Sequence, residues 1–101
     1  MSEGLRLDKW LWHARFAKTR SLAARLIEDG AVLLDGQAVK PAQTVRIGSR
    51  LSIRLGHREH RVEIRALGER RGPAPKARLL YAELAPPAPA ARADWSPLFE
   101  D

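Results

Sequence analysis

The sequence predicts an α+β fold in which two N-terminal helices pack on a small antiparallel sheet, followed by a short C-terminal helix and a tail. Helical spacing of apolar residues marks residues 7–29, whereas alternation of period two dominates residues 31–66. An Asp-Gly pair between two short apolar runs indicates a tight hairpin. A chain of 101 residues can bury one modest core, so we expect a single small domain.

The first predicted helix covers residues 7–18. Asp8 lies in its first turn, where a carboxylate is favourable at the positive end of the helix dipole. Trp12 and Phe16 lie on the polar side, one turn apart. We expect the C-terminal helix or the tail to cover them as a second small core; stacking on RNA bases is the alternative. The apolar stripe consists of Leu7, Trp10, Leu11, Ala14 and Ala17.

The second predicted helix covers residues 20–29. Thr19 is the expected N-cap, with Ser21 as the alternative, and Gly30 suits the left-handed position just past the helix end. The runs that follow the helix flank Asp35-Gly36, a pair typical of a type I′ hairpin turn. The predicted buried face of this helix consists of Leu22, Ala23, Leu26 and Ile27.

Short alternating runs predict the rest of the sheet. Residues 45–47 lead to a turn at Gly48, and residues 51–55 alternate as a strand with one buried face. Residues 56–59 predict a turn, and residues 62–66 predict the antiparallel partner strand.

The C-terminal third is less regular. Residues 68–76 form a basic loop rich in Gly and Pro, and residues 77–84 favour a short helix over a final strand. Residues 86–101 predict a flexible or extended tail. The apolar side chains of the tail, which either dock on the body or stay loose, are Trp95, Leu98 and Phe99.

The charge is large and unevenly distributed. The net charge is +6, and 14 of the 18 basic residues are Arg. Residues 1–82 hold 17 Lys and Arg against 8 Asp and Glu, or +9, whereas residues 83–101 hold 1 against 4, or −3. Guanidinium groups bind phosphates in a bidentate manner and stack on bases. A basic body of this size indicates a nucleic-acid binder, unless the Arg content only reflects a compositional bias.

Several function classes are disfavoured. The chain has no cysteine, which excludes disulfides, thiolate metal sites and thiol nucleophiles. No segment approaches the roughly 18 apolar residues that a membrane span needs, and the N-terminus has no signal-peptide pattern, so we expect a cytoplasmic protein. His13, His57 and His60 lack metal-ligand spacing, and no phosphate loop or nucleophile elbow is present. We therefore predict no catalysis, no metal and no cofactor.

The junction between the two helices carries the most specific cluster of candidate residues. If the helices pack as an angled pair, cationic and hydroxyl side chains gather where the free N–H groups of the second helix point. Such an arrangement binds anions, and RNA phosphate fits the charge of this chain. The alternative is a solvated helix corner with surface arginines. The residues expected at this junction are Arg15, Lys18, Thr19, Arg20 and Ser21.

Residues 6–53 resemble the alpha-L RNA-binding motif of ribosomal small-subunit protein four. Residues 5–84 also resemble the stand-alone, ribosome-associated heat-shock branch of that family, which lacks a catalytic domain. Those members usually carry a long basic C-terminal helix, whereas this chain ends in an acidic segment rich in Pro and Ala. The matching marks are Arg6-Leu7-Asp8, Thr19-Arg20, Ile27, Gly30, Val32, Asp35-Gly36 and Gly48.

The resemblance implies a non-enzymatic protein that binds rRNA of the large ribosomal subunit. Stalled or free subunits carrying peptidyl-tRNA are the implied target, in ribosome rescue or quality control, with tRNA as a further partner. It implies an alpha-L domain with its sheet over residues 1–67, a loop and helix over 68–85, and the tail over 86–101. We expect a monomer. The predicted RNA-binding residues are Arg6, Lys9, Arg15, Lys18, Thr19, Arg20, Ser21, Arg25 and Lys40.

Two alternatives share parts of this pattern. A DNA-binding helix-turn-helix protein has a similar helix pair, but its recognition helix projects base-reading polar side chains, whereas residues 22–29 offer mainly Ala, Arg and acid. An accessory RNA-binding module of a separate RNA-modification enzyme would show the same basic surface.

Overall fold

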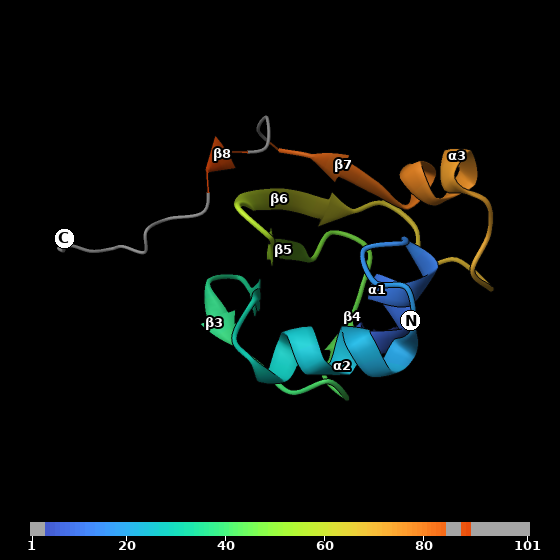
Figure 1. The fold of residues 1–101 in the computed structure, drawn as a ribbon. Helices are drawn as coiled ribbons and strands as arrows, with labels where there is room; N and C mark the ends of the chain where they lie inside the picture. Colours follow the sequence, from blue (N-terminus) through green and yellow to red (C-terminus); the bar gives the residue numbers. More distant parts are fainter. Residues whose placement is uncertain (1–3, 85–87, 90–101) are drawn as a thin grey trace, which may run out of the picture.

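The computed structural model describes residues 4–84 and 88–89, and it confirms the α+β class (Figure 1). The helices are α1 (Leu7–His13), α2 (Arg20–Glu28) and α3 (Ala74–Ala77), and α3 continues into the 3₁₀ turn η1 (Arg78–Leu80). The strands are β1 (Leu5–Arg6), β2 (Val32–Leu34), β3 (Gln37–Ala38), β4 (Thr44–Val45), β5 (Arg50–Leu55), β6 (Arg58–Ile64), β7 (Tyr81–Glu83) and β8 (Ala88–Pro89).

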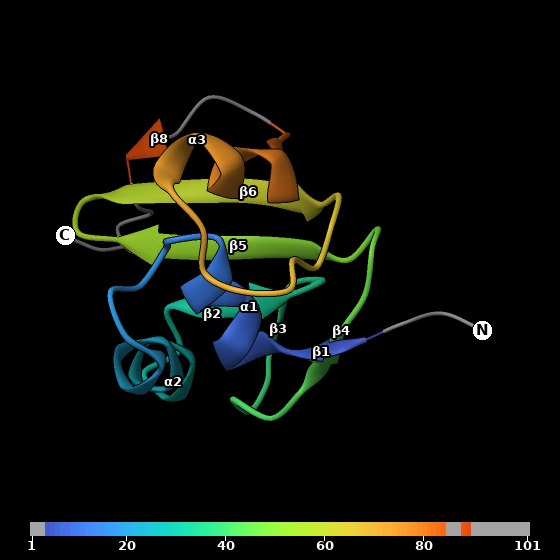
Figure 2. The ribbon, with the colours of Figure 1, turned by 90° about the vertical axis from the view of Figure 1, so that its right-hand side faces the viewer.

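The main sheet is antiparallel, with the order β3-β2-β5-β6-β7, and β8 also pairs with β6. Strands β1 and β4 form a separate pair. Figure 2 shows α1 in front of the sheet, over β2 and β5. In the central register Leu51 faces Val62 and Ile53 faces His60. This face of β5 and β6 packs in one hydrophobic core with α1 and α2.

The first helix ends at His13, five residues before the predicted end. Arg15 takes the left-handed conformation with φ of 65°, which is uncommon for a residue other than Gly. Its N–H donates to the Trp12 carbonyl at 3.2 Å, and the Phe16 N–H donates to the Leu11 carbonyl at 2.9 Å. These two bonds are the Schellman closure of a helix. Periodicity alone missed the end because Ala14 and Ala17 beyond it are also buried.

The helix end turns Phe16 into the core. Its ring centroid lies 4.8 Å from that of Tyr81 and 6.0 Å from that of Trp10. Phe16 is therefore covered, as expected, but the cover includes Tyr81 of β7, a strand and not the predicted helix. Trp12 is half-buried, with its ring 5.6 Å from His13.

The second helix and the hairpin follow their local signals. The Thr19 hydroxyl accepts a hydrogen bond from the Leu22 N–H at 3.1 Å, which confirms Thr19 as the N-cap. Gly30, at φ 80°, ends the helix as predicted, and the positive φ angles of Asp35 and Gly36 match the type I′ turn. One expectation is wrong: Leu22 is 46% exposed and does not belong to the buried face of α2.

The C-terminal expectation needs correction. Residues 77–84 do not form one helix, because Tyr81–Glu83 is the strand β7, antiparallel to β6. The N–H groups of Arg65 and Ala66 donate to the Leu80 carbonyl. The edge of β6 needs such a partner, and this long-range demand overrides the local helical pattern. Strand β6 also starts earlier than predicted, at Arg58, and stops at Ile64.

The predicted tail, residues 86–101, lies outside the described residues except for β8. The backbone of Ala88 pairs with Glu59, and that of Pro89 with Arg58. The tail residues Trp95, Leu98 and Phe99 also lie outside the described part of the chain.

Candidate nucleic-acid interface

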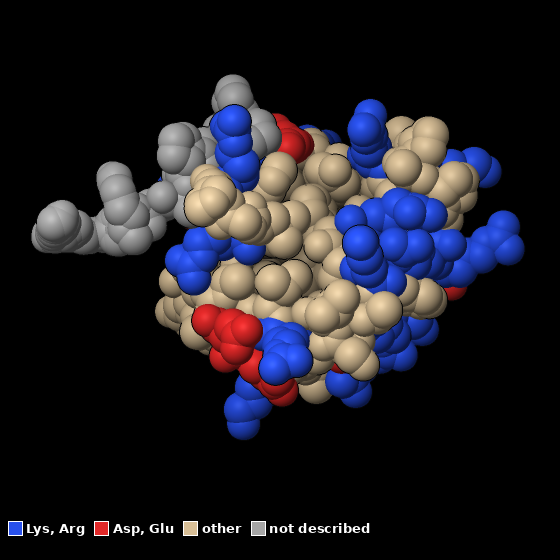
Figure 3. Space-filling model, in the orientation of Figure 1, with Lys and Arg blue, Asp and Glu red and all other residues tan. Residues whose placement is uncertain are grey.

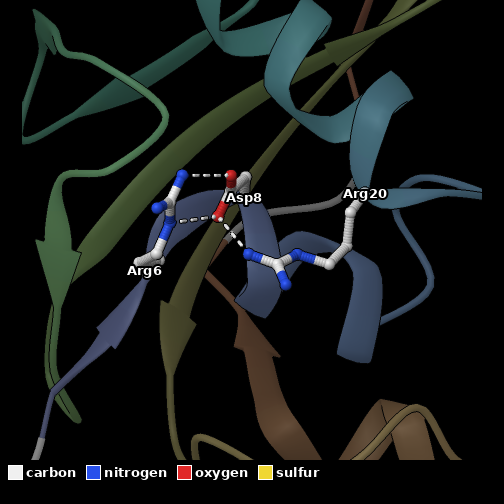
Figure 4. A network of polar contacts seen from close by, with 3 residues as sticks. All are labelled: Arg6, Asp8 and Arg20. Carbon is white, nitrogen blue, oxygen red and sulfur yellow. Dashed lines mark hydrogen bonds and ion pairs between the residues drawn. The ribbon is translucent and has the colours of Figure 1, made fainter.

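A buried carboxylate holds two arginines at the start of α1 (Figure 4). The side chain of Asp8 is only 6% exposed. Arg6 of β1 donates to both of its oxygens, from Nε to Oδ1 at 3.1 Å and from Nη2 to Oδ2 at 2.9 Å. Arg20 of α2 approaches Oδ1 with its Nη2 at 3.6 Å. Three elements therefore meet at a single carboxylate.

This pairing leaves both guanidinium groups available to a ligand. The side chains of Arg6 and Arg20 are 53% and 45% exposed. The hydrogen bond to Asp8, together with its negative charge, raises the pKa of Arg6 above its ordinary value, so the group stays charged. Because Asp8 already restrains the two side chains, binding avoids much of the ordering cost of about 0.5–1.5 kcal/mol per side chain. Arg6, Arg20 and Asp8 together carry one net positive charge.

The backbone fixes the position of Asp8. Its N–H donates to the Pro41 carbonyl at 3.2 Å, and the Leu7 N–H donates to the Gln43 carbonyl at 2.8 Å. The loop after the hairpin therefore anchors the start of α1. Lys40 is exposed and directly precedes Pro41, whose carbonyl accepts from the Asp8 N–H. The backbone of Lys40 therefore lies near the start of α1.

The start of α2 adds backbone donors. Within the described residues, the N–H groups of Arg20 and Ser21 have no acceptor, as is usual for the first turn of a helix. They lie at the positive end of the helix dipole. The Thr19 hydroxyl is occupied by its cap bond, so its observed part is to fix the helix start.

Arg15 does not join Arg20. Its Nε donates to the Gly72 carbonyl at 2.7 Å, which ties the end of α1 to the loop before α3. Seven helical residues span about 10 Å, so Arg15 and Asp8 lie toward opposite ends of α1. The predicted junction cluster is thus divided into an Asp8 group and an Arg15 group.

The conformation of Arg15 leads to a stability prediction. A left-handed φ costs a residue with a Cβ roughly 1 kcal/mol, and Gly avoids this cost. We expect Arg15→Gly to be about 1 kcal/mol more stable than Arg15→Ala, since both lose the bond to Gly72 and only Ala keeps the strain. Urea denaturation measures the difference. Equal stability of the two variants would show that the φ of 65° carries no strain.

Lys18 and Arg25 flank a different feature. They line an open groove of about 480 Å³ whose apolar residues include Phe16, Leu22 and Leu26. Lys9 is half-buried on α1 and forms no ion pair within the described residues. The nine predicted residues therefore spread over the Asp8 group, the start of α2 with Thr19 and Ser21, the Arg15 contact, this groove and two separate lysines.

Comparison with known proteins then identifies the family. The model of the S4 domain matches residues 5–51. The RQC P-site tRNA stabilizing factor of Listeria innocua is 35% identical over 69 residues, which cover 68% of this chain and 75% of that protein. The chain belongs to the S4-domain family.

Two further relatives extend the match beyond the S4 domain itself. Heat shock protein 15 of Escherichia coli K12 is 49% identical over 81 residues, covering 80% of this chain and 61% of that protein. The solved trimeric heat shock protein 15 of Vibrio cholerae superposes with a TM-score of 0.79 at 48% identity, covering 82% of this chain and 84% of that one. The chain thus spans about 61% of the length of the Escherichia coli relative.

All nine predicted residues lie within the S4 domain, but the basic surface extends further. Figure 3 shows Lys and Arg side chains gathered on the side that carries α1 and α3. Arg70, Arg71 and Lys76 of the loop and α3 belong to the stretch that the sequence marks as basic, although it was not predicted as a site. The bond from Arg15 to Gly72 joins this loop to the S4 domain.

Among the described residues, no group of three or more His, Cys, Asp or Glu side chains could hold a metal ion. No described helix combines the length and the apolar character that a membrane crossing requires.

Proposed function

We propose that this protein is a non-catalytic RNA-binding protein of the cytoplasm that binds rRNA of the large ribosomal subunit. Its proposed target is a stalled or free subunit that carries peptidyl-tRNA, and its proposed role is ribosome rescue or quality control. Binding neutralises phosphates and recognises RNA shape, with no bond chemistry.

One observation carries the RNA-binding part of this proposal. Asp8 is buried and holds the half-exposed guanidinium groups of Arg6 and Arg20, and Arg20 is also the first residue of α2. Ordinary surface arginines are not fixed in this way. Pre-positioned guanidinium groups suit phosphate oxygens, and so do the unpaired backbone N–H groups of a helix start. We propose that all nine predicted residues contribute, with Arg6 and Arg20 at the centre.

The names of the relatives support the choice of partner. One group is named for stabilising P-site tRNA in ribosome quality control, and the other is named as heat shock protein 15. Both groups match most of this chain. The first name and the basic surface therefore support a ribosomal partner that carries a tRNA.

Sucrose-gradient co-sedimentation with separated ribosomal subunits tests the proposal. We expect the protein to move with large subunits, more strongly when they carry peptidyl-tRNA, and not with small subunits. Displacement by duplex DNA as easily as by RNA would instead support the DNA-binding alternative. Capture of one RNA-modification enzyme without ribosomal subunits would support the accessory-module alternative.

A further inference from the structure

An apolar groove runs along α2, beside the segment that joins this helix to α1. The groove has a volume of about 480 Å³, and its large apolar side chains are Phe16, Leu22 and Leu26. Leu22 is 46% exposed, although helical periodicity places it on the buried side of the helix. Apolar side chains that gather at one surface site, and do not occur singly, mark a site where another group binds.

The charged residues of the groove favour an acidic ligand. Lys18 and Arg25 line the groove and are exposed, and neither forms an ion pair within the residues that the structure describes. Asp29, at the C-terminal end of α2, is the one carboxylate among the described lining residues. The lining therefore carries one net positive charge. A ligand that combines apolar side chains with carboxylates fits this groove.

The chain itself contains such a segment beyond β8. Residues 94–101 read DWSPLFED, in which a Trp, a Leu and a Phe lie between acidic residues. The segment holds three acidic residues and no basic one, so its net charge is −3. It lies outside the described residues. Its apolar side chains and its carboxylates complement the groove in both polarity and charge.

The strand that precedes this segment lies close to the groove. The backbone of Pro89 in β8 pairs with that of Arg58 in β6. Two residues further along β6, the ring centroid of His60 lies 6.0 Å from that of Phe16 in the groove. In Figure 2, β8, the turn between β5 and β6 and the segment joining α1 to α2 lie on the same side of the molecule. Trp95 follows Pro89 by six residues, which span about 20 Å when extended, so the segment can reach the groove.

We propose that residues 94–101 bind in this groove of the same molecule. The apolar side chains of the segment cover Leu22 and Leu26, and its carboxylates lie beside Lys18 and Arg25. A tether this short gives an effective concentration in the millimolar range, so a contact with a Kd of about 1 mM is sufficient. Since Lys18 and Arg25 are two of the proposed RNA contacts, the docked segment competes with RNA. This competition rests on the proposed function, whereas the docking does not.

A nitroxide spin label on Ser96→Cys tests the docking in the full chain, which has no other cysteine. We expect the label to broaden the amide NMR signals of Leu22 and Leu26. The amide of Gly48 should broaden clearly less, because it donates to the Ile64 carbonyl at the end of β6 opposite to β8. Equal broadening at both places, or none at Leu22 and Leu26, would overturn the proposal.

Two controls identify the occupant of the groove. Leu22→Glu replaces an exposed side chain, so the fold should persist, and the new carboxylate should release the segment and restore the Leu26 signal. Mixing ¹⁵N protein that lacks the label with spin-labelled protein of natural isotope content should cause no broadening. Broadening in that mixture would assign the groove to the segment of a second copy, and broadening that persists in Leu22→Glu would place the segment elsewhere. Either result contradicts the proposal.

RNA affinity tests the competition separately. Trp95→Ser/Leu98→Ser/Phe99→Ser removes the apolar side chains of the segment but no charge, so the net attraction to RNA is unchanged. We expect this variant to bind isolated large-subunit rRNA about threefold more tightly, the factor for a protein that is two-thirds docked. Equal affinity alongside the expected broadening would refute the competition. If neither protein bound rRNA while the broadening was observed, the proposed function alone would be refuted.

Discussion

Replacing both Arg6 and Arg20 by Ala is expected to weaken RNA binding strongly and to reduce its salt dependence. Each phosphate contact contributes roughly 0.7–0.9 to the slope of log K against log salt, so losing two contacts should lower the slope by about 1.4–1.8. The reason is structural: these are the two guanidinium groups that Asp8 fixes at the α1–α2 corner. Filter binding or fluorescence anisotropy over a salt series measures the change.

A matched control separates this site from net charge. Arg54 and Arg61 lie on the outer face of β5 and β6, because their neighbours Ile53 and Val62 face the core. Arg54→Ala/Arg61→Ala removes the same charge and should change the affinity much less. If both double variants lost equal affinity and equal slope, the corner would act only through the total charge of the protein.

Trp10→Ala is expected to have the largest effect on stability. The side chain is fully buried, and its ring contacts those of Phe16 and Tyr81, with centroids 6.0 and 6.4 Å away. Its Nε1 also donates to the Ala66 carbonyl at 3.0 Å. Large-to-small changes of a buried Trp cost about 3–5 kcal/mol, a large part of the roughly 5–15 kcal/mol stability of a small domain.

Urea denaturation of Trp10→Ala, compared with Trp12→Ala, measures this effect. Trp12 lies on the same helix but is only half-buried, so replacing it should lower the free energy of unfolding clearly less, by about 1 kcal/mol. Equal losses would mean that the aromatic cluster of Trp10, Phe16 and Tyr81 does not hold α1 to the sheet.

The parts of the fold that local chemistry decides could be predicted from the sequence. Thr19 caps α2 through its own hydroxyl, and Gly30 suits a left-handed position. The Asp35-Gly36 turn likewise needs only its own two residues. Each of these signals lies within a few residues of the feature that it determines, so no tertiary information was needed.

The wrong predictions concern features that depend on contacts between residues far apart in the sequence. The end of α1 was missed because Arg15 holds a position that usually belongs to Gly, and its partner Gly72 is 57 residues away. Strand β7 was assigned to a helix because the edge of β6 supplies its hydrogen bonds. Leu22 was placed in the core because helical periodicity does not give the width of the buried face.

In the candidate site, too, local sequence predicts some features and distant contacts determine the others. Residue type and charge were sufficient to select Arg6 and Arg20, but not to pair them. Asp8 was interpreted only as a favourable charge at the helix start, whereas it is the carboxylate that both arginines share. Such a pairing depends on how β1, α1 and α2 meet, which no short stretch of sequence contains.

RNA affinity of Asp8→Asn tests the central claim most directly, because two accounts predict opposite signs. The variant gains one positive charge, so a protein that binds RNA only through its net charge should bind more tightly. If Asp8 positions Arg6 and Arg20, the variant should bind about fivefold more weakly, since the side chains must be ordered on binding. Weaker binding by a folded variant is the result we predict, and tighter binding would contradict a built phosphate site at this corner.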